Sequence, residues 1–184
     1  MKITHLIISF VGFALMTSNV LLAQSPKIDD VNIEELEKKA EAGDAKSQHA
    51  LGFNLTLLSQ DQEVQKKGLY WLNKAIEQKY PNSMNFMASL LLTKAKIAQG
   101  DTNVSTPEQT AAALIDSSTD PIEDALELYR EASMRGNANS SFTLGVLYCF
   151  GQNVQTDVPL AIKWLEKAWA QKEPQAATLL GMIY

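Results

Sequence analysis

Residues 138–172 read ANSSFTLGVLYCFGQNVQTDVPLAIKWLEKAWAQK. The first part is apolar with a Leu-Gly step inside it, the centre is polar, and the last part is apolar again. In the last part, Ala161, Trp164, Leu165 and Ala168 stand at i, i+3, i+4 and i+7. That spacing marks one face of an α-helix. The stretch therefore predicts a pair of helices, over about 138–150 and 157–171, joined by a polar turn.

The same helix pair recurs along the chain at a fixed period. The first helix carries a Gly or Ala after a Leu or Met at four places, which are Gly52, Ala88, Gly145 and Gly181. These residues lie 36, 57 and 36 positions apart, and 57 is one period of 36 plus 21 further residues. The second helix repeats its small residue at Gly68, Ala125 and Ala161, again 57 and 36 positions apart. Two independent marks thus indicate one period and one insertion at the same place.

Such a unit cannot bury its apolar face alone, so neighbouring pairs must stack around a continuous core. A repeated Gly in the middle of a helix costs about 1 kcal/mol relative to Ala. Close approach of the partner helix explains it, because a side chain would hold the two backbones apart. We therefore expect larger residues at Gly145 to destabilise the fold.

These residues resemble the Sel-1-like repeat, a helix pair related to the tetratricopeptide repeat. The resemblance is best over 138–172, weaker where Met87 and Ala88 replace Leu-Gly, and lacks the loop Gly at Leu58. It implies an all-α fold, a right-handed α/α solenoid of stacked helix pairs, but no particular activity. The residues that match the repeat pattern are Leu51, Gly52, Trp71, Ala75, Leu144, Gly145, Tyr148, Gly151, Asp157, Ala161, Trp164, Ala168 and Gly181.

The first residues are expected to lie outside this fold. Lys2 precedes an apolar stretch over 6–16, and Ala23 stands at a suitable cleavage position. This is the layout of a secretory signal peptide over 1–23. Its uninterrupted apolar run is too short for a comfortable membrane span. We expect periplasmic or secreted protein after cleavage, without stable membrane insertion; an uncleaved N-terminal anchor is the alternative. A polar leader would follow over 24–30.

The solenoid is then expected over 31–184. A helix ending at Gly43 should cap the stack, with repeats at about 44–79, 80–136 and 137–172 and a partial repeat over 173–184. The insertion, 100–120, is polar at both ends, whereas Thr106, Pro107 and Gln109 have the arrangement of a capping box. We expect a short helix over 107–115. The insertion is interpreted as either a binding element or a tolerated surface extension.

Composition excludes several classes of function. The 184-residue chain is 46% hydrophobic and 20% charged, which suits one domain with a substantial core. Removing residues 1–23 leaves 15 basic and 21 acidic residues, a formal charge of −6, which argues against nucleic-acid binding. With His49 as its one histidine and no catalytic serine or phosphate-loop motif, the mature chain offers no catalytic residue, metal site or cofactor site. Cys149, the one cysteine, is expected to be a buried structural thiol.

Function should then lie in a surface that binds another protein. Family resemblance implies that the first helices line a concave side. The residues left over from the core there are His49, Phe53, Asn82, Asn85, Ser89, Asn139, Phe142 and Val146. Phe53, Phe142 and Val146 would be apolar groups on a polar groove, which suits protein binding. The alternative is that these side chains pack between repeats.

Three functions compete on this basis. The first is a secreted or periplasmic scaffold that binds a protein through the concave face or the 100–120 insertion. The second is an immunity or inhibitor protein that neutralises a periplasm-acting toxin. The third, a β-lactamase-like enzyme, comes from family resemblance alone, and a chain with one Cys and no serine or zinc motif does not support it.

The C-terminal stretch ATLLGMIY, 177–184, aligns with FTLGVLY, with Gly181 on Gly145 and Tyr184 on Tyr148. It therefore corresponds to the first helix of a further repeat. The expected outcomes are a compact final helix, an open edge that allows self-association or partner binding, or a truncated gene.

Overall fold

The structure, a computed structural model, describes residues 33–100, 106–116 and 120–184, and these contain helices but no strand. The expected signal peptide and polar leader lie outside the described residues, and both stay predictions. The helices are α2 (Ile33–Glu41), α3 (Ala45–Leu58), α4 (Gln62–Glu77), α5 (Pro81–Ala98), α6 (Pro107–Leu114), α7 (Pro121–Met134), α8 (Ala138–Phe150), α9 (Val158–Ala170) and α10 (Pro174–Ile183).

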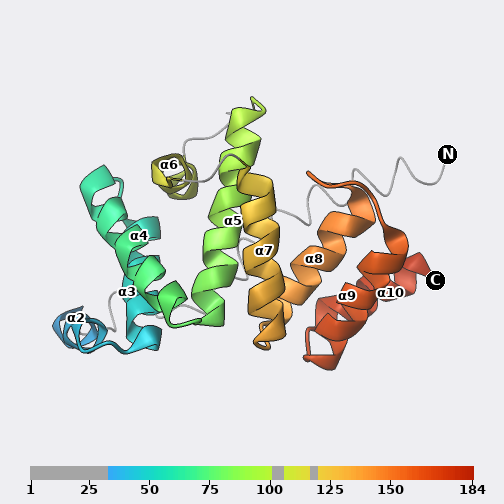
Figure 1. Cartoon of the computed structure of the whole chain (residues 1–184), viewed down its shortest axis with the longest axis horizontal. Coiled ribbons are helices and arrows are strands. Elements are labelled where there is room, and N and C mark those ends of the chain that lie inside the picture. Colours follow the sequence, from blue (N-terminus) through green and yellow to red (C-terminus); the bar gives the residue numbers. More distant parts are fainter. Residues whose placement is uncertain (1–32, 101–105, 117–119) are drawn as a thin grey trace.

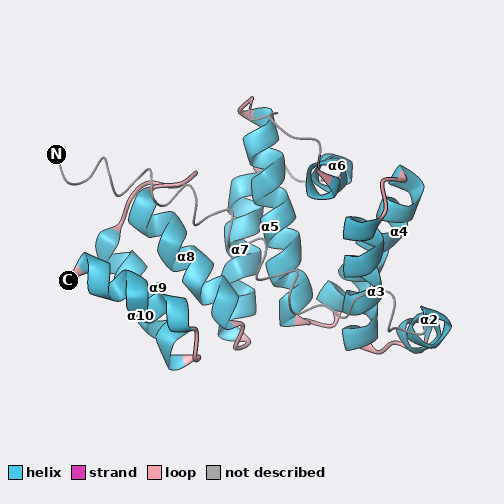
Figure 2. Ribbon diagram, turned by 180° about the vertical axis from the view of Figure 1, so that it is seen from behind, coloured by secondary structure: helices cyan, strands magenta, loops and turns pink. Residues whose placement is uncertain are grey.

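Three helix pairs follow one another along the long axis of the molecule: α3 with α4, α5 with α7, and α8 with α9 (Figure 1). Helix α2 lies at one end and α10 at the other, and the view from behind shows the same order (Figure 2). The fold is the all-α, right-handed α/α solenoid that the sequence predicts.

The 36-residue period reappears in the backbone at the ends of the second helices. Gly43, Lys79, Gly136 and Lys172 all have a positive φ, of 93°, 62°, 90° and 69°. They lie 36, 57 and 36 positions apart, the same spacings as the small residues Gly52, Ala88, Gly145 and Gly181 of the first helices. A left-handed residue ends a helix by turning the chain while the last carbonyls keep hydrogen-bond partners. Every second helix, α2 included, is therefore ended by the same device.

A repeated hydrogen-bond clamp shows that α2 takes the place of a second helix. The Gln48 side chain donates to the carbonyl oxygen of Ala40 (3.0 Å) and accepts from the Gln78 amide (2.8 Å). Ser133, Ser141 and Gln171, each 93 positions further on, are also joined by hydrogen bonds, with other donors. Gln171 donates to the carbonyl oxygen of Ser133 (3.1 Å) and accepts from the Ser141 hydroxyl (2.6 Å), which also bonds the Ser133 hydroxyl (2.7 Å). The backbone carbonyl group of Ala40 in α2 thus accepts a hydrogen bond from a glutamine side chain of the first repeat, as that of Ser133 in α7 accepts one from the third repeat. Helix α2 therefore caps the stack as expected.

The glycine steps lie where the two helices of a pair cross. A Cβ built on Gly52 would lie 2.8 Å from the backbone oxygen of Gly68 and 2.8 Å from the backbone nitrogen of Leu72. One built on Gly145 would lie 2.6 Å from Cγ of Leu165. The expected close approach is present at both positions. At Gly181, by contrast, no described atom outside the local helix lies within 4 Å of such a Cβ, because no second helix follows α10 among the described residues.

The other repeat-defining residues are mostly in the core. Leu51, Ala75, Leu144, Ala161 and Ala168 are buried. The side chains of Trp71, Tyr148 and Trp164 are half-buried, Gly151 ends α8 with a φ of 66°, and the Asp157 carboxylate accepts from the Leu160 amide (3.0 Å) at the start of α9.

The helix of the insertion belongs to the core, which contradicts its interpretation as a surface extension. The predicted capping box is formed: the Gln109 amide donates to the Thr106 hydroxyl (3.3 Å), and the Thr106 amide donates to the Gln109 side chain (3.1 Å). Ala111 and Ala112 are fully buried, and α6 packs against α3, α4 and α5. The buried amide of Gln65 donates to the carbonyl oxygen of Pro107 (3.2 Å). The insertion therefore holds the first and second repeats together.

Candidate functional site: a groove between α4 and α7

The apolar residues predicted for a concave binding face lie between repeats instead. Phe53 is 5% exposed and Phe142 is 6% exposed. The ring of Phe53 lies 4.7 Å from that of Phe86 on α5, centre to centre. Phe142 belongs to a core cluster that includes Leu165 and Leu179, against which the half-buried Val146 packs. The expectation that these side chains face a groove is wrong, because the first helices of successive repeats pack directly on one another.

The polar residues of the same set mostly form hydrogen bonds with a neighbouring repeat. Nδ1 of His49 lies 3.0 Å from Oγ of Ser83. The Ser140 hydroxyl donates to the buried Asn85 (2.8 Å), and the Asn137 amide donates to Asn82 (2.9 Å). The Ser89 hydroxyl donates to the carbonyl oxygen of Phe86 (2.7 Å), and Asn139 is half-buried. Within this set Asn82 is exposed, and a role for it and Asn139 in partner binding stays a prediction.

The position of His49 makes stability depend on pH. Burial between the rings of Phe53 and Tyr80 lowers the pKa of His49 to about 4, from an ordinary 6.5. The unfolded imidazole takes up a proton below about pH 6.5, whereas the folded one does so only near pH 4. The free energy of unfolding should therefore fall as the pH falls through this window, by about 1.4 kcal/mol per pH unit.

The measurement is urea unfolding at pH 7.0 and pH 4.5 of the wild type and of His49→Gln. We expect the wild type to lose about 2–3 kcal/mol more than the variant between these two pH values. Carboxylates titrate in both proteins, so the difference between their losses of unfolding free energy reports on His49 alone. Equal losses would show that His49 is as easily protonated in the folded chain as in the unfolded one.

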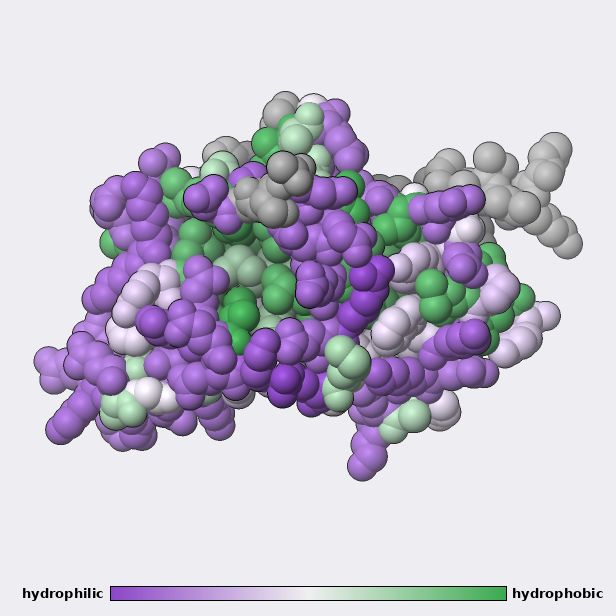
Figure 3. Space-filling view, in the orientation of Figure 1, coloured by the Kyte–Doolittle hydropathy of each residue, from purple (hydrophilic) through white to green (hydrophobic). Residues whose placement is uncertain are grey.

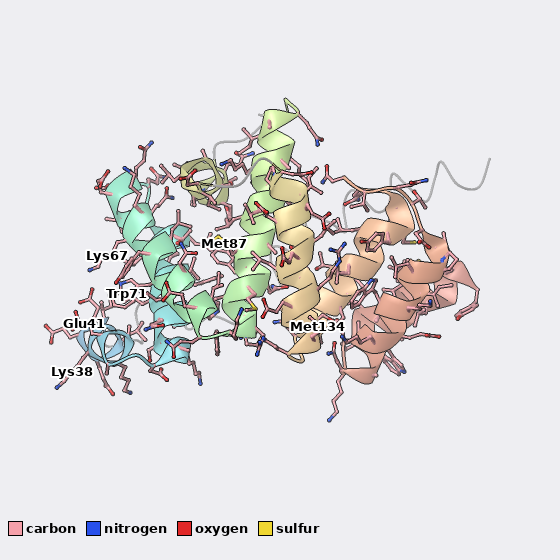
Figure 4. All side chains as sticks on the ribbon, viewed as in Figure 1. Lys38, Glu41, Lys67, Trp71, Met87 and Met134 are labelled. Carbon is pink, nitrogen blue, oxygen red and sulfur yellow. The ribbon has the colours of Figure 1, made fainter. Side chains whose placement is uncertain are left out.

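A groove between the second helices α4 and α7 leaves apolar side chains partly accessible, on the side of the stack away from the first-helix contacts described above. Its volume is about 630 Å³, within the range of about 300–1,000 Å³ common to pockets that bury ligands. Figure 3 shows hydrophobic surface there, ringed by hydrophilic side chains, and Figure 4 shows Met87 in the space between α4 and α5. The groove is lined by Lys66, Leu69, Tyr70, Asn73, Met87, Leu91, Leu114, Ile115, Asp116, Asp124, Glu127, Leu128 and Glu131.

Helix packing explains why the groove is there. Helix α4 packs on α5 and α6, while α4 and α7 scarcely contact one another. The inserted helix α6, which comes from within the second repeat, packs at the junction between the first two repeats, among α3, α4 and α5. The apolar side chains of α4 and α7 that face this space therefore remain partly uncovered. Leu128 is half-buried, and Tyr70 is 53% exposed.

The rim of the groove is acidic. Among the lining residues, four carry carboxylates and only Lys66 carries an amine, whose Nζ lies 2.8 Å from Oε1 of Glu63. At one end, Nζ of Lys79 and Nη2 of Arg135 each lie 3.2 Å from Oε1 of Glu131. The hydrogen bond from Lys79, with that from Arg135, holds the pKa of the Glu131 carboxyl below its ordinary value. The groove thus combines an apolar floor with a rim that attracts cations.

Sequence reasoning missed these residues, although one signal pointed to them. The 21-residue insertion falls between the two helices of the second repeat. An extra helix at a single junction must alter the packing there, but the sequence does not tell which side of the stack opens.

The described residues contain no group of three or more His, Cys, Asp or Glu placed to hold a metal ion. Cys149 is half-buried rather than buried, and desolvation raises the pKa of its thiol, so a reactive thiolate is disfavoured. None of the helices formed by these described residues is long and apolar enough to cross a membrane.

The Sel1 repeat family model matches this chain three times, over residues 45–80, 116–137 and 139–172. A curated relative, the ERAD-associated E3 ubiquitin-protein ligase component HRD3A of Arabidopsis thaliana, is 29% identical over 147 residues. That match covers 79% of this chain, which spans only 20% of the length of the relative.

One solved structure agrees with the fold. A Sel1 repeat protein from Oxalobacter formigenes matches with a TM-score of 0.55 and 25% identity, over 80% of this chain and 95% of that one. A protective antigen from uropathogenic Escherichia coli is similar at 22% identity with a TM-score of 0.34, over 84% of this chain and 36% of that one, a match too weak to carry an argument. With its family matches, helix order and glycine spacing in agreement, this chain belongs to the Sel1 repeat family.

Proposed function

We propose that this chain is a protein-binding scaffold that holds a segment of another protein in the groove between α4 and α7. The observation that carries the proposal is the groove itself, a depression of about 630 Å³ with apolar side chains at its base and a polar rim. Depressions that combine apolar side chains with a few polar groups are a common form of binding site. A toxin neutralised by this chain would be one specific form of such a partner.

The family supports this proposal. Sel1 repeats typically mediate protein interactions, and the family is generally non-catalytic. The relative HRD3A is named as a component of an E3 ubiquitin-protein ligase, which describes that protein and not this chain. Binding through an added helix at one junction fits a family in which one scaffold serves many partners.

A photo-cross-linking experiment tests the proposal. A photoreactive phenylalanine replaces either Tyr70 at the groove or Trp169 on α9. The two positions are matched because both are aromatic and their exposed fractions are 53% and 55%. In cells of the source organism, a discrete adduct is expected from position 70 and not from position 169. The partner identified from the adduct is then purified without cross-linking. It should bind the Tyr70→Ala variant of this chain at least tenfold more weakly than it binds the wild type. Equal binding to both proteins, or the same adducts from both positions, would count against the groove.

We also propose that the chain acts outside the cytoplasm, after cleavage behind Ala23. The arrangement of Lys2, the apolar stretch over 6–16 and Ala23 supports this proposal. Intact-mass measurement of the protein from its native host should give a chain that begins at Gln24, recovered from the periplasm or the medium. A full-length chain that keeps Met1 or Lys2 would contradict cleavage.

A further inference from the structure

We infer that the groove selects a helical segment with one apolar face bordered by basic residues. This inference rests on the proposed function and adds the chemistry of the partner. It follows from the shape of the groove, from the placement of its apolar side chains and from the distribution of its charges.

The shape of the groove suits a helix. Its side walls are α4 and α7, of 16 and 14 residues, which corresponds to a wall about 20 Å long. A segment of about 14 residues in helical form matches that length. Leu114 and Ile115, at the end of α6, also line the groove, so the insertion contributes to the binding surface.

The apolar side chains come from every element around the groove. Met87 and Leu91 of α5 stand one helical turn apart and form the base with Leu69 of α4, all three 4–7% exposed. Leu128 of α7, with Leu114 and Ile115, is half-buried and offers more of its side chain. Residues one turn apart on a helix form a ridge that fits between the i, i+3, i+4 side chains of a second helix. An occupant with apolar residues at i, i+3, i+4 and i+7 would fill this floor in the way that helix-in-groove complexes do.

The charges select basic flanks. Asp124, Glu127 and Glu131 are spaced three and four residues apart along α7, and Asp116 follows α6 at the same groove. Because Glu131 is already paired with Lys79 and Arg135, an occupant would meet chiefly the exposed carboxylates of Glu127 and Asp116. The α4 wall instead presents Tyr70, Asn73 and Lys66. Lys or Arg on the side of the occupant that faces α7 would meet these carboxylates, whereas an acidic or nucleic-acid partner would be repelled.

Two synthetic 18-residue peptides test the inference. Both carry Leu at i, i+3, i+4 and i+7 positions with Ala and Gln elsewhere; one has Lys beside the apolar face and the other has Glu. Binding of each labelled peptide to the purified protein is measured by fluorescence anisotropy at about 50 mM and about 500 mM salt. The variants are Glu127→Lys, its matched control Glu166→Lys on α9, and Tyr70→Ala. Residues 127 and 166 are exposed glutamates on second helices, so the two reversals change the net charge equally.

We expect the Lys peptide to bind at least tenfold more tightly than the Glu peptide at low salt, with the difference shrinking at high salt because screening weakens exposed charge pairs. Glu127→Lys should weaken binding of the Lys peptide about tenfold, whereas Glu166→Lys should weaken it less than twofold. Equal binding of both peptides, weakened by Tyr70→Ala, would overturn the charge inference while leaving the groove as a binding site. Failure of both peptides to bind, or binding that Tyr70→Ala does not change, would overturn the inference together with the proposed function.

Discussion

Replacing Gly52 with Ala is expected to lower the free energy of unfolding by about 2–3 kcal/mol, although Ala favours helix more than Gly does. The added methyl group would lie 2.8 Å from three atoms of α4, two of them in the backbone. Backbone atoms cannot turn aside as a flexible side chain can, so α3 and α4 would have to move apart. For a chain of this length, the loss corresponds to a fall in Tm of about 5–10 °C.

Gly181→Ala is the matched control, because Gly181 occupies the same repeat position on α10. No described atom outside its own helix lies within 4 Å of the added methyl group. The free energy of unfolding should therefore stay the same or rise by up to about 1 kcal/mol. Thermal unfolding followed by circular dichroism measures both changes. If the two variants shift Tm in the same direction by similar amounts, close helix approach is not the reason for the repeated glycine.

Replacing Ala112 with Glu should cost about 3–5 kcal/mol of stability, because it places an unpaired carboxylate in the core. Ala112 is fully buried on α6, which packs against α3, α4 and α5. The loss of stability cannot exceed the cost of detaching α6, because the helix can leave its site and expose the apolar surface beneath it instead of burying the carboxylate. Either result should appear as a lower midpoint in urea unfolding.

Ala113→Glu is the control on the adjacent residue. Ala113 is exposed on the same helix, so we expect a change within about 0.5 kcal/mol. A large loss at residue 112 with none at residue 113 would show that the insertion is an integral part of the core. Equal and small effects at both positions would mean that α6 is a detachable appendage, and the groove would then lose one of its walls.

The sequence predicts the helices and the repeat period well because both depend on local or strictly repeated chemistry. Thr106 at the N-cap and Gln109 three residues later form a capping box through local hydrogen bonds, whatever surrounds the helix. The glycines at 52 and 145 reflect a steric requirement that recurs wherever the two helices of a pair cross. Such requirements leave a spacing that can be counted along the chain.

The binding surface could not be predicted in the same way. Helical spacing places Phe53 and Phe142 on one face, but it does not tell whether solvent or the next repeat meets that face. Alanine is equally compatible with a surface helix and with a close-packed one, so Ala111 and Ala112 gave no sign of their burial. The groove depends on the distance between α4 and α7, which α6 and the packing of three repeats determine together.

Hydrogen–deuterium exchange, measured with and without the Lys peptide at saturating concentration, tests most directly whether the groove is the binding surface. We expect slower exchange in α4, α6 and α7, which line the groove, and unchanged exchange in α8, α9 and α10. Slower exchange in α3 and α8, with α4 and α7 unchanged, would place binding on the first helices and contradict binding in the groove.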